Sequence, residues 1–140
     1  MAASNSIPRF MEKVAQQNIC AKFGASTKGF SAAFRKLVDQ PGAFDDPSEP
    51  IVREYPNLTF KPDAWLIDGR VVKLWEIEDS HPLSEAKLRK IVDLFWFCDE
   101  EEIELHCYIA DRYGSVMSEL ELSEMAYSVM AVDHGQTREG

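Results

Sequence analysis

The fold of this chain depends most on residues 60–78, which read FKPDAWLIDGRVVKLWEIE. Asp68-Gly69 stands between two apolar runs in this segment. The Asp-Gly dipeptide is a strong short-range signal for a β-hairpin, because glycine adopts the positive φ of the turn without steric cost. The two flanking runs are therefore predicted to pair as antiparallel strands.

Three carboxylates lie on this predicted hairpin. A two-residue loop can begin at either residue of the Asp-Gly dipeptide, which places Asp63 opposite Leu74 or opposite Glu76. Both registers have the same parity, so Asp63, Glu76 and Glu78 lie on one face of the hairpin in either case. Such neighbours are roughly 4.5–8 Å apart, and one ion can bridge them. A three-residue loop would instead move Asp63 to the opposite face.

Crowded carboxylates raise one another's pKa and resist joint ionisation unless a cation holds them. Val72 and Leu74 precede the two glutamates on the same strand face, so that face begins apolar and ends acidic, as at the mouth of a core. The pattern predicts a metal site on Asp63, Glu76 and Glu78. Hard oxygen ligands suit Mg2+ or Mn2+, which can activate water and neutralise a phosphodiester. The plainer alternative is a solvated acidic strand face that binds no metal.

At these residues the chain resembles the PD-(D/E)xK nuclease superfamily, whose signature is a Pro-Asp on one strand and an acidic-x-Lys on the next, followed by a helix. Pro62-Asp63 matches the first element, and Glu76-Ile77-Glu78 stands at the second. Glu78 occupies the lysine position, as glutamate does in some restriction endonucleases of this superfamily. The resemblance covers about residues 51–111.

The resemblance implies a restriction-endonuclease-like core and a Mg2+- or Mn2+-dependent endonuclease acting on nucleic acid, with DNA as the expected substrate. It also implies a homodimer, since small nucleases of this kind often pair two subunits to cut two strands. Its catalytic residues would be Asp63, Glu76 and Glu78, with a lysine from the next helix. Lys87 is preferred to Lys90, because a helix that begins near Ser84 brings its first turn close to the carboxylate strand.

Hydrophobic periodicity predicts one α/β domain over residues 1–133, with a mixed central sheet of about four strands flanked by helices, and a polar tail over residues 134–140. Helical spacing recurs in three places, namely residues 7–14, residues 30–38 and the segment after Ser84. Alternation predicts a strand over residues 103–109, and residues 51–55 are expected to form a strand before the hairpin. Residues 116–132 are predicted to form the last helix, with Ser118 and Glu121 as a capping box.

The charge of the chain is unevenly distributed. The net charge is -9, which argues against indiscriminate binding to nucleic acid, yet residues 1–40 carry a net +4 and the remaining hundred residues a net -13. A basic N-terminal layer could hold a phosphate backbone beside the carboxylates, form half of a self-association surface, or be an ordinary solvated pair of helices.

The chain contains neither a run apolar enough to span a bilayer nor the layout of a signal peptide. Its three cysteines, Cys20, Cys98 and Cys107, are widely spaced and are expected to be buried apolar residues in a reducing compartment. A cytoplasmic protein without a membrane partner is therefore expected.

The leading hypothesis is a metal-dependent nuclease with Asp63 and Glu76 as ligands, Glu78 as ligand or base, and Lys87 stabilising developing charge. The alternative is a non-catalytic acidic interaction or inhibitor protein on a nuclease-like scaffold, of the kind that a phage or mobile element would encode, with a protein partner. Glycoside hydrolysis ranks lower, because Glu76 and Glu78 project from one strand rather than across a substrate. His81, in the loop after Glu78, is a further candidate for a base or a phosphate ligand.

Overall fold

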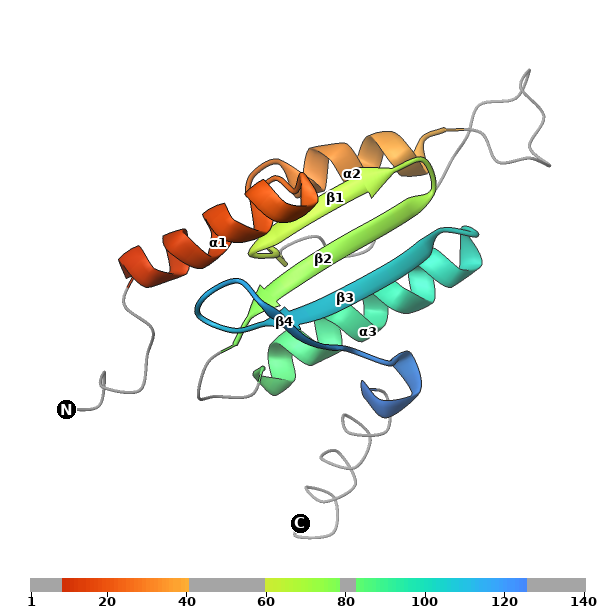
Figure 1. Ribbon diagram of the computed structural model, residues 1–140. Helices are drawn as coiled ribbons and strands as arrows, with labels where there is room; N and C mark the ends of the chain where they lie inside the picture. Colours follow the sequence, from red (N-terminus) through yellow and green to blue (C-terminus); the bar gives the residue numbers. More distant parts are fainter. Residues whose placement is uncertain (1–8, 41–59, 79–82, 126–140) are drawn as a thin grey trace, which may run out of the picture.

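The computed structural model describes residues 9–40, 60–78 and 83–125 and is shown in Figure 1. The predicted hairpin is formed by β1 (Ala64–Asp68) and β2 (Val71–Ile77), which run antiparallel. Helix α3 (Glu85–Glu100) then returns the chain so that β3 (Glu104–Ala110) pairs parallel with β2. Strand β4 (Val116–Glu119) pairs antiparallel with β3, which completes the order β1-β2-β3-β4. An α/β fold with a mixed four-stranded sheet in the described part of the chain confirms the predicted fold class.

The turn between β1 and β2 determines which of the two predicted registers occurs. The loop consists of Gly69 and the residue after it, and Gly69 has a positive φ of 59°. At the open end of the hairpin, pairing extends to Ala64 opposite Trp75. The next residues outward are Asp63 and Glu76, which by this register stand opposite each other. The second of the two predicted registers is therefore confirmed.

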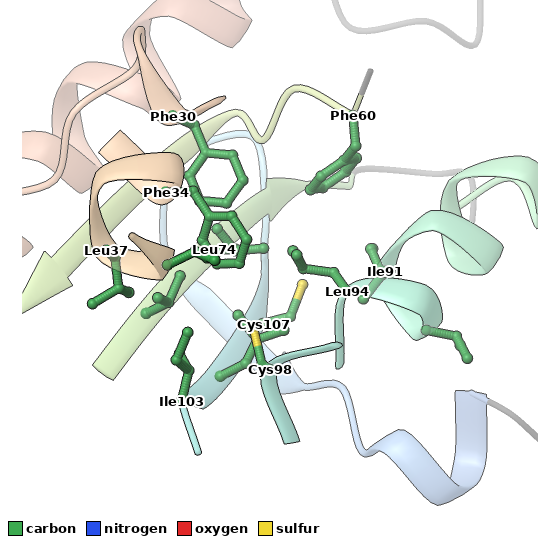
Figure 2. Close-up of a cluster of buried hydrophobic side chains, with 14 of the residues drawn as sticks. Phe30, Phe34, Leu37, Phe60, Leu74, Ile91, Leu94, Cys98, Ile103 and Cys107 are labelled. Carbon is green, nitrogen blue, oxygen red and sulfur yellow. The ribbon is translucent and has the colours of Figure 1, made fainter. Parts of the chain in front are cut away.

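The two faces of the sheet contact different helices. Helix α1 (Arg9–Phe23) packs Ile19 against Trp75 on one face. Helices α2 (Phe30–Val38) and α3 cover the other face, where the larger core lies (Figure 2). The labelled side chains of that core come from both helices and from the strands, and include Phe34, Leu74, Ile91 and Cys107. No helix within the described ranges is both long enough and apolar enough to cross a bilayer.

Helix α3 begins where the sequence predicts. Ser84 is its N-cap, and the Ser84 hydroxyl accepts a hydrogen bond from the backbone N–H of Lys87 at 3.2 Å. The cap satisfies one of the amides that have no partner inside the helix. Because α3 follows β2 directly in the element order, this first turn lies beside the end of the carboxylate strand (Figure 1).

The predicted helix over residues 116–132 is wrong at its start. Val116–Glu119 forms strand β4, and Ser118 pairs with Ile109 of β3 instead of capping a helix. Helical structure in this region begins only at residue 122. The cause is a contact between distant parts of the chain: without β4, the backbone groups at the edge of β3 would lack hydrogen-bond partners. The turn at residues 111–115, held by the Asp111 carboxylate, returns the chain to that edge.

Other predictions fall outside the described residues. The expected strand over residues 51–55, His81 and the tail over residues 134–140 belong to this group. All three cysteines lie within the described residues and are free thiols. Cys98 and Cys107 are buried, and Cys20 is half-buried.

Gly114 packs the turn between β3 and β4 against α1, and its φ is 81°. A Cβ at this position would lie 2.7 Å from the backbone oxygen of Ala15. We expect Gly114→Ala to lower the free energy of unfolding by about 2–3 kcal/mol, because the left-handed backbone costs about 1–2 kcal/mol and the clash adds to it. Urea unfolding measures the change. Gly69→Ala is the matched control, since its φ is also positive but a Cβ there meets no atom within 4 Å. Equal losses in the two variants would contradict the prediction.

Candidate functional site

Glu76 is the central residue of the candidate site. It lies near the end of β2 on the face that α3 covers, and its side chain is 0% exposed. A carboxylate removed from water in this way is unfavourable unless other groups compensate its charge. One neighbour that can do so comes from the first turn of α3, whereas the neighbour just before β1 is a second carboxylate.

Lys87 supplies the cationic neighbour. Its Nζ lies 2.5 Å from Oε2 of Glu76, and the lysine side chain is 30% exposed, so it reaches from the surface into the buried site. The same Nζ lies 5.6 Å from the centre of the Phe60 ring, within cation–π range. Because Lys87 lies three residues after the Ser84 N-cap, in the first turn of α3, its side chain reaches the buried Glu76.

Asp63 supplies the second carboxylate. Its Oδ2 accepts a hydrogen bond from the backbone N–H of Ile77 at 2.8 Å, which fixes the carboxylate at the end of β2. The Asp63 carbonyl oxygen accepts a hydrogen bond from Nε2 of Gln16 on α1, also at 2.8 Å. Both the hairpin partner and a helix from the other face of the sheet therefore hold Asp63 in position.

Glu76 and Lys87 perturb each other's ionisation, and the charge of Asp63 acts on both. The pKa of Glu76 is raised to about 9, mainly by burial and next by the negative charge of Asp63, and Lys87 offsets only part of the rise. Burial by itself would lower the pKa of Lys87, but the charge of Glu76 outweighs it and the net pKa is raised. At neutral pH the lysine is protonated and the raised pKa of Glu76 favours its protonated carboxyl group, and the ion pair with Lys87 is the form that Glu76 takes when it ionises.

The donor set leaves room for a cation. Neither buried oxygen of Glu76 has a hydrogen-bond donor among the described residues, and Oε2 alone faces Lys87 as an ion-pair contact. A buried carboxylate oxygen without a donor, beside a second carboxylate, fits a hard divalent ion. No group of three His, Cys, Asp or Glu residues is positioned to hold a metal in the described ranges. An ion would therefore have two protein carboxylates and would keep several waters, as Mg2+ commonly does.

Three of the four predicted site residues lie together in the structure. Asp63, Glu76 and Lys87 form one cluster, and Lys87 rather than Lys90 reaches Glu76, as its place in the first turn suggested. Glu78 continues the sheet, and its backbone N–H donates to the Ala110 carbonyl oxygen at 2.7 Å. Its carboxylate makes no contact with the cluster among the described residues, so its predicted role stays a prediction.

Two supporting residues were not identified from the sequence. Gln16 has no sequence signal that relates it to Asp63, because the contact joins helix and hairpin across 47 positions. Phe60 is the first residue of the segment 60–78, but its contact with Lys87 depends on how α3 packs against the sheet. Helix docking, and not local pattern, produces both contacts.

No protein-family model matches this sequence, and no curated protein matches it.

Proposed function

We propose that this protein is a Mg2+- or Mn2+-dependent nuclease that hydrolyses phosphodiester bonds, with DNA as the first substrate to test. The observation that carries the proposal is the buried Glu76 carboxyl group between Asp63 and Lys87, because each of the three groups has a distinct use in this chemistry. The resemblance to the PD-(D/E)xK superfamily at Pro62-Asp63 and Glu76 is consistent with it.

In this proposal Asp63 and Glu76 hold the ion through one carboxylate each. The ion, when bound, lowers the pKa of the attacking water and neutralises charge on the phosphodiester. Lys87 donates to the phosphate oxygens as their negative charge increases, and the Phe60 ring lies beside its Nζ. Glu78, at the end of the same strand, would serve as a further ligand or accept the proton of the attacking water.

The second candidate is a non-catalytic acidic interaction protein. The net charge of -9 and the direct Lys87–Glu76 ion pair favour it, because a lysine can balance a buried glutamate with no ion present. Such a protein would bind a basic patch on its partner. The two candidates differ in whether a divalent ion binds at Asp63 and Glu76.

Calorimetric titration with Mn2+ at pH 6 and pH 8 distinguishes them. Glu76 must release its proton to bind an ion, so we expect the affinity to rise by up to about tenfold per pH unit over this interval. Asp63→Asn and Glu76→Gln should each weaken binding by at least about tenfold. Asp68→Asn is the matched control, because Asp68 is an exposed carboxylate at the last residue of β1, next to the hairpin turn.

The same proteins are then incubated with plasmid DNA and with single-stranded RNA in Mg2+, in Mn2+ and in EDTA. Ion-dependent cleavage by the wild type and the Asp68→Asn control, and not by the two site variants, is the expected result. If Mn2+ binding is absent at both pH values, or is equal in all four proteins, and no substrate is cut, the nuclease proposal is wrong and the interaction protein is favoured.

A further inference from the structure

The positive charge of this acidic protein is concentrated in one stretch of the chain. Residues 13–38 carry five basic side chains and no acidic one, whereas the whole chain has a net charge of -9. This stretch covers most of α1, the loop at residues 24–29 and α2. A positive surface on an otherwise acidic protein attracts polyanions locally and repels them elsewhere.

Two cavities are open on this basic stretch. The first has a volume of about 400 Å3 and is lined by α1 and the loop, including Lys13, Gln17 and Lys28. The second has a volume of about 230 Å3 and is lined by the loop, the start of α2 and the segment before β1, including Ser31 and Lys61. Thr27 and Lys28 line both cavities, so the two adjoin at these residues, and the pair of cavities is called the depression below.

The loop that joins the two cavities is anchored to the sheet. Ser26 and Trp65 exchange backbone hydrogen bonds of 2.8 Å at the free edge of β1, and Nε1 of Trp65 donates to the carbonyl oxygen of Lys28 at 3.1 Å. The backbone that carries Lys28 is thereby held in place. The side chains of Lys13, Lys28 and Lys61 are exposed, and none of them has an ion-pair partner among the described residues.

Each cavity has one lining residue that contacts a member of the cluster of Asp63, Glu76 and Lys87. Gln16 lines the larger cavity and donates a hydrogen bond to the backbone carbonyl oxygen of Asp63. Phe60 lines the smaller one and contacts Lys87. Gln16 and Phe60 thus connect the cavity walls to the cluster, whose own members line neither cavity.

We propose that this depression binds the phosphate backbone of a nucleic-acid strand through Lys13, Lys28 and Lys61 and leads it to Asp63 and Glu76. The direction of the strand toward a cleavage point rests on the proposed nuclease function, but the binding surface does not. Lysines that follow a groove supply sequence-independent contacts to phosphates, and Gln17, Thr27 and Ser31 can add neutral hydrogen bonds.

Fluorescence anisotropy with a fluorescein-labelled 15-nucleotide single strand, as DNA and as RNA, tests this surface in EDTA, so that no cleavage is required. We expect the variant Lys13→Gln/Lys28→Gln/Lys61→Gln to bind at least about tenfold more weakly in 50 mM salt. The slope of log affinity against log salt concentration should fall by about 2, since each lost contact to a single strand contributes about 0.7.

The control variant is Lys36→Gln/Lys73→Gln/Lys90→Gln, which removes the same charge from lysines outside both cavities. Loss of binding to DNA, RNA or both in the cavity variant alone supports the proposal and identifies the strand. Three results would overturn the proposal: equal losses of affinity in the two variants, no binding of either strand by the wild type, or a cavity variant that binds as the wild type does but sediments differently, as expected of a self-association surface. Binding without any cleavage by the wild type would leave the surface established and refute only the nuclease.

Discussion

Replacing Lys87 with methionine is expected to reduce the rate of phosphodiester cleavage by about 10²–10³-fold, with little change in affinity for the substrate. Methionine keeps most of the apolar stem against Phe60 but removes the charge that lies 2.5 Å from Glu76. A cationic donor that acts on charge developing in the transition state is commonly worth this factor. Single-turnover cleavage with saturating Mg2+ separates the rate from substrate binding.

Lys90→Met is the matched control, because it removes a lysine from the same helix that does not reach the cluster. Lys87→Arg keeps a positive charge in the first turn and should retain more activity than Lys87→Met. Thermal unfolding followed by circular dichroism verifies that each variant is folded. Folded Lys87→Met with wild-type cleavage rates would show that the lysine only balances Glu76.

Replacing Glu76 with glutamine is expected to remove most of the dependence of stability on pH between 6 and 8. In the wild type without a divalent ion, the folded-state pKa of Glu76 is raised to about 9, far above the value of about 4.3 in an unfolded chain. The folded state therefore holds a proton that the unfolded state has released. Stability from this group is fully present below pH 4.3 and is lost as the pH rises toward 9.

The maximum slope is about 1.4 kcal/mol per pH unit, so the wild type should lose up to about 2.7 kcal/mol between pH 6 and pH 8. Urea unfolding in EDTA at the two pH values measures this loss. His106 adds a change of the same sign, because the Glu104 and Glu119 carboxylates raise its pKa, but this change is common to the wild type and the variant. The difference between the two proteins isolates Glu76.

Asp68→Asn, which alters an exposed carboxylate, should keep the wild-type slope. Adding Mn2+ at pH 8 should restore stability to the wild type and not to Glu76→Gln, since an ion that binds only the folded state stabilises it. Parallel pH profiles for wild type and Glu76→Gln would mean that Glu76 is ionised in the fold without an ion. The raised pKa of Glu76, which is the main electrostatic argument for a cation site at the two carboxylates, would then be wrong.

Local chemistry was sufficient to predict the hairpin and the start of α3. The positive φ that a glycine allows at residue 69 and the hydroxyl cap of Ser84 act over a few residues, so they can be read directly from the chain. The parity of β-strands then placed Asp63 and Glu76 on one face, and the place of Lys87 in the first turn of the helix favoured it over Lys90. The choice between the two hairpin registers could not be made in this way, because both satisfy the same parity.

Strand alternation and helix capping act over a few residues, so the order of residues along the chain is enough to predict which side chains share a face. Tertiary packing, by contrast, makes residues 116–119 the edge strand β4 instead of a helix, since the unpaired edge of β3 outweighs a helical pattern. It also decided that Gln16 holds Asp63 and that Glu76 is fully buried. Both outcomes arise from helices docking on opposite faces of the sheet, an interaction between segments far apart in the chain that no local pattern encodes.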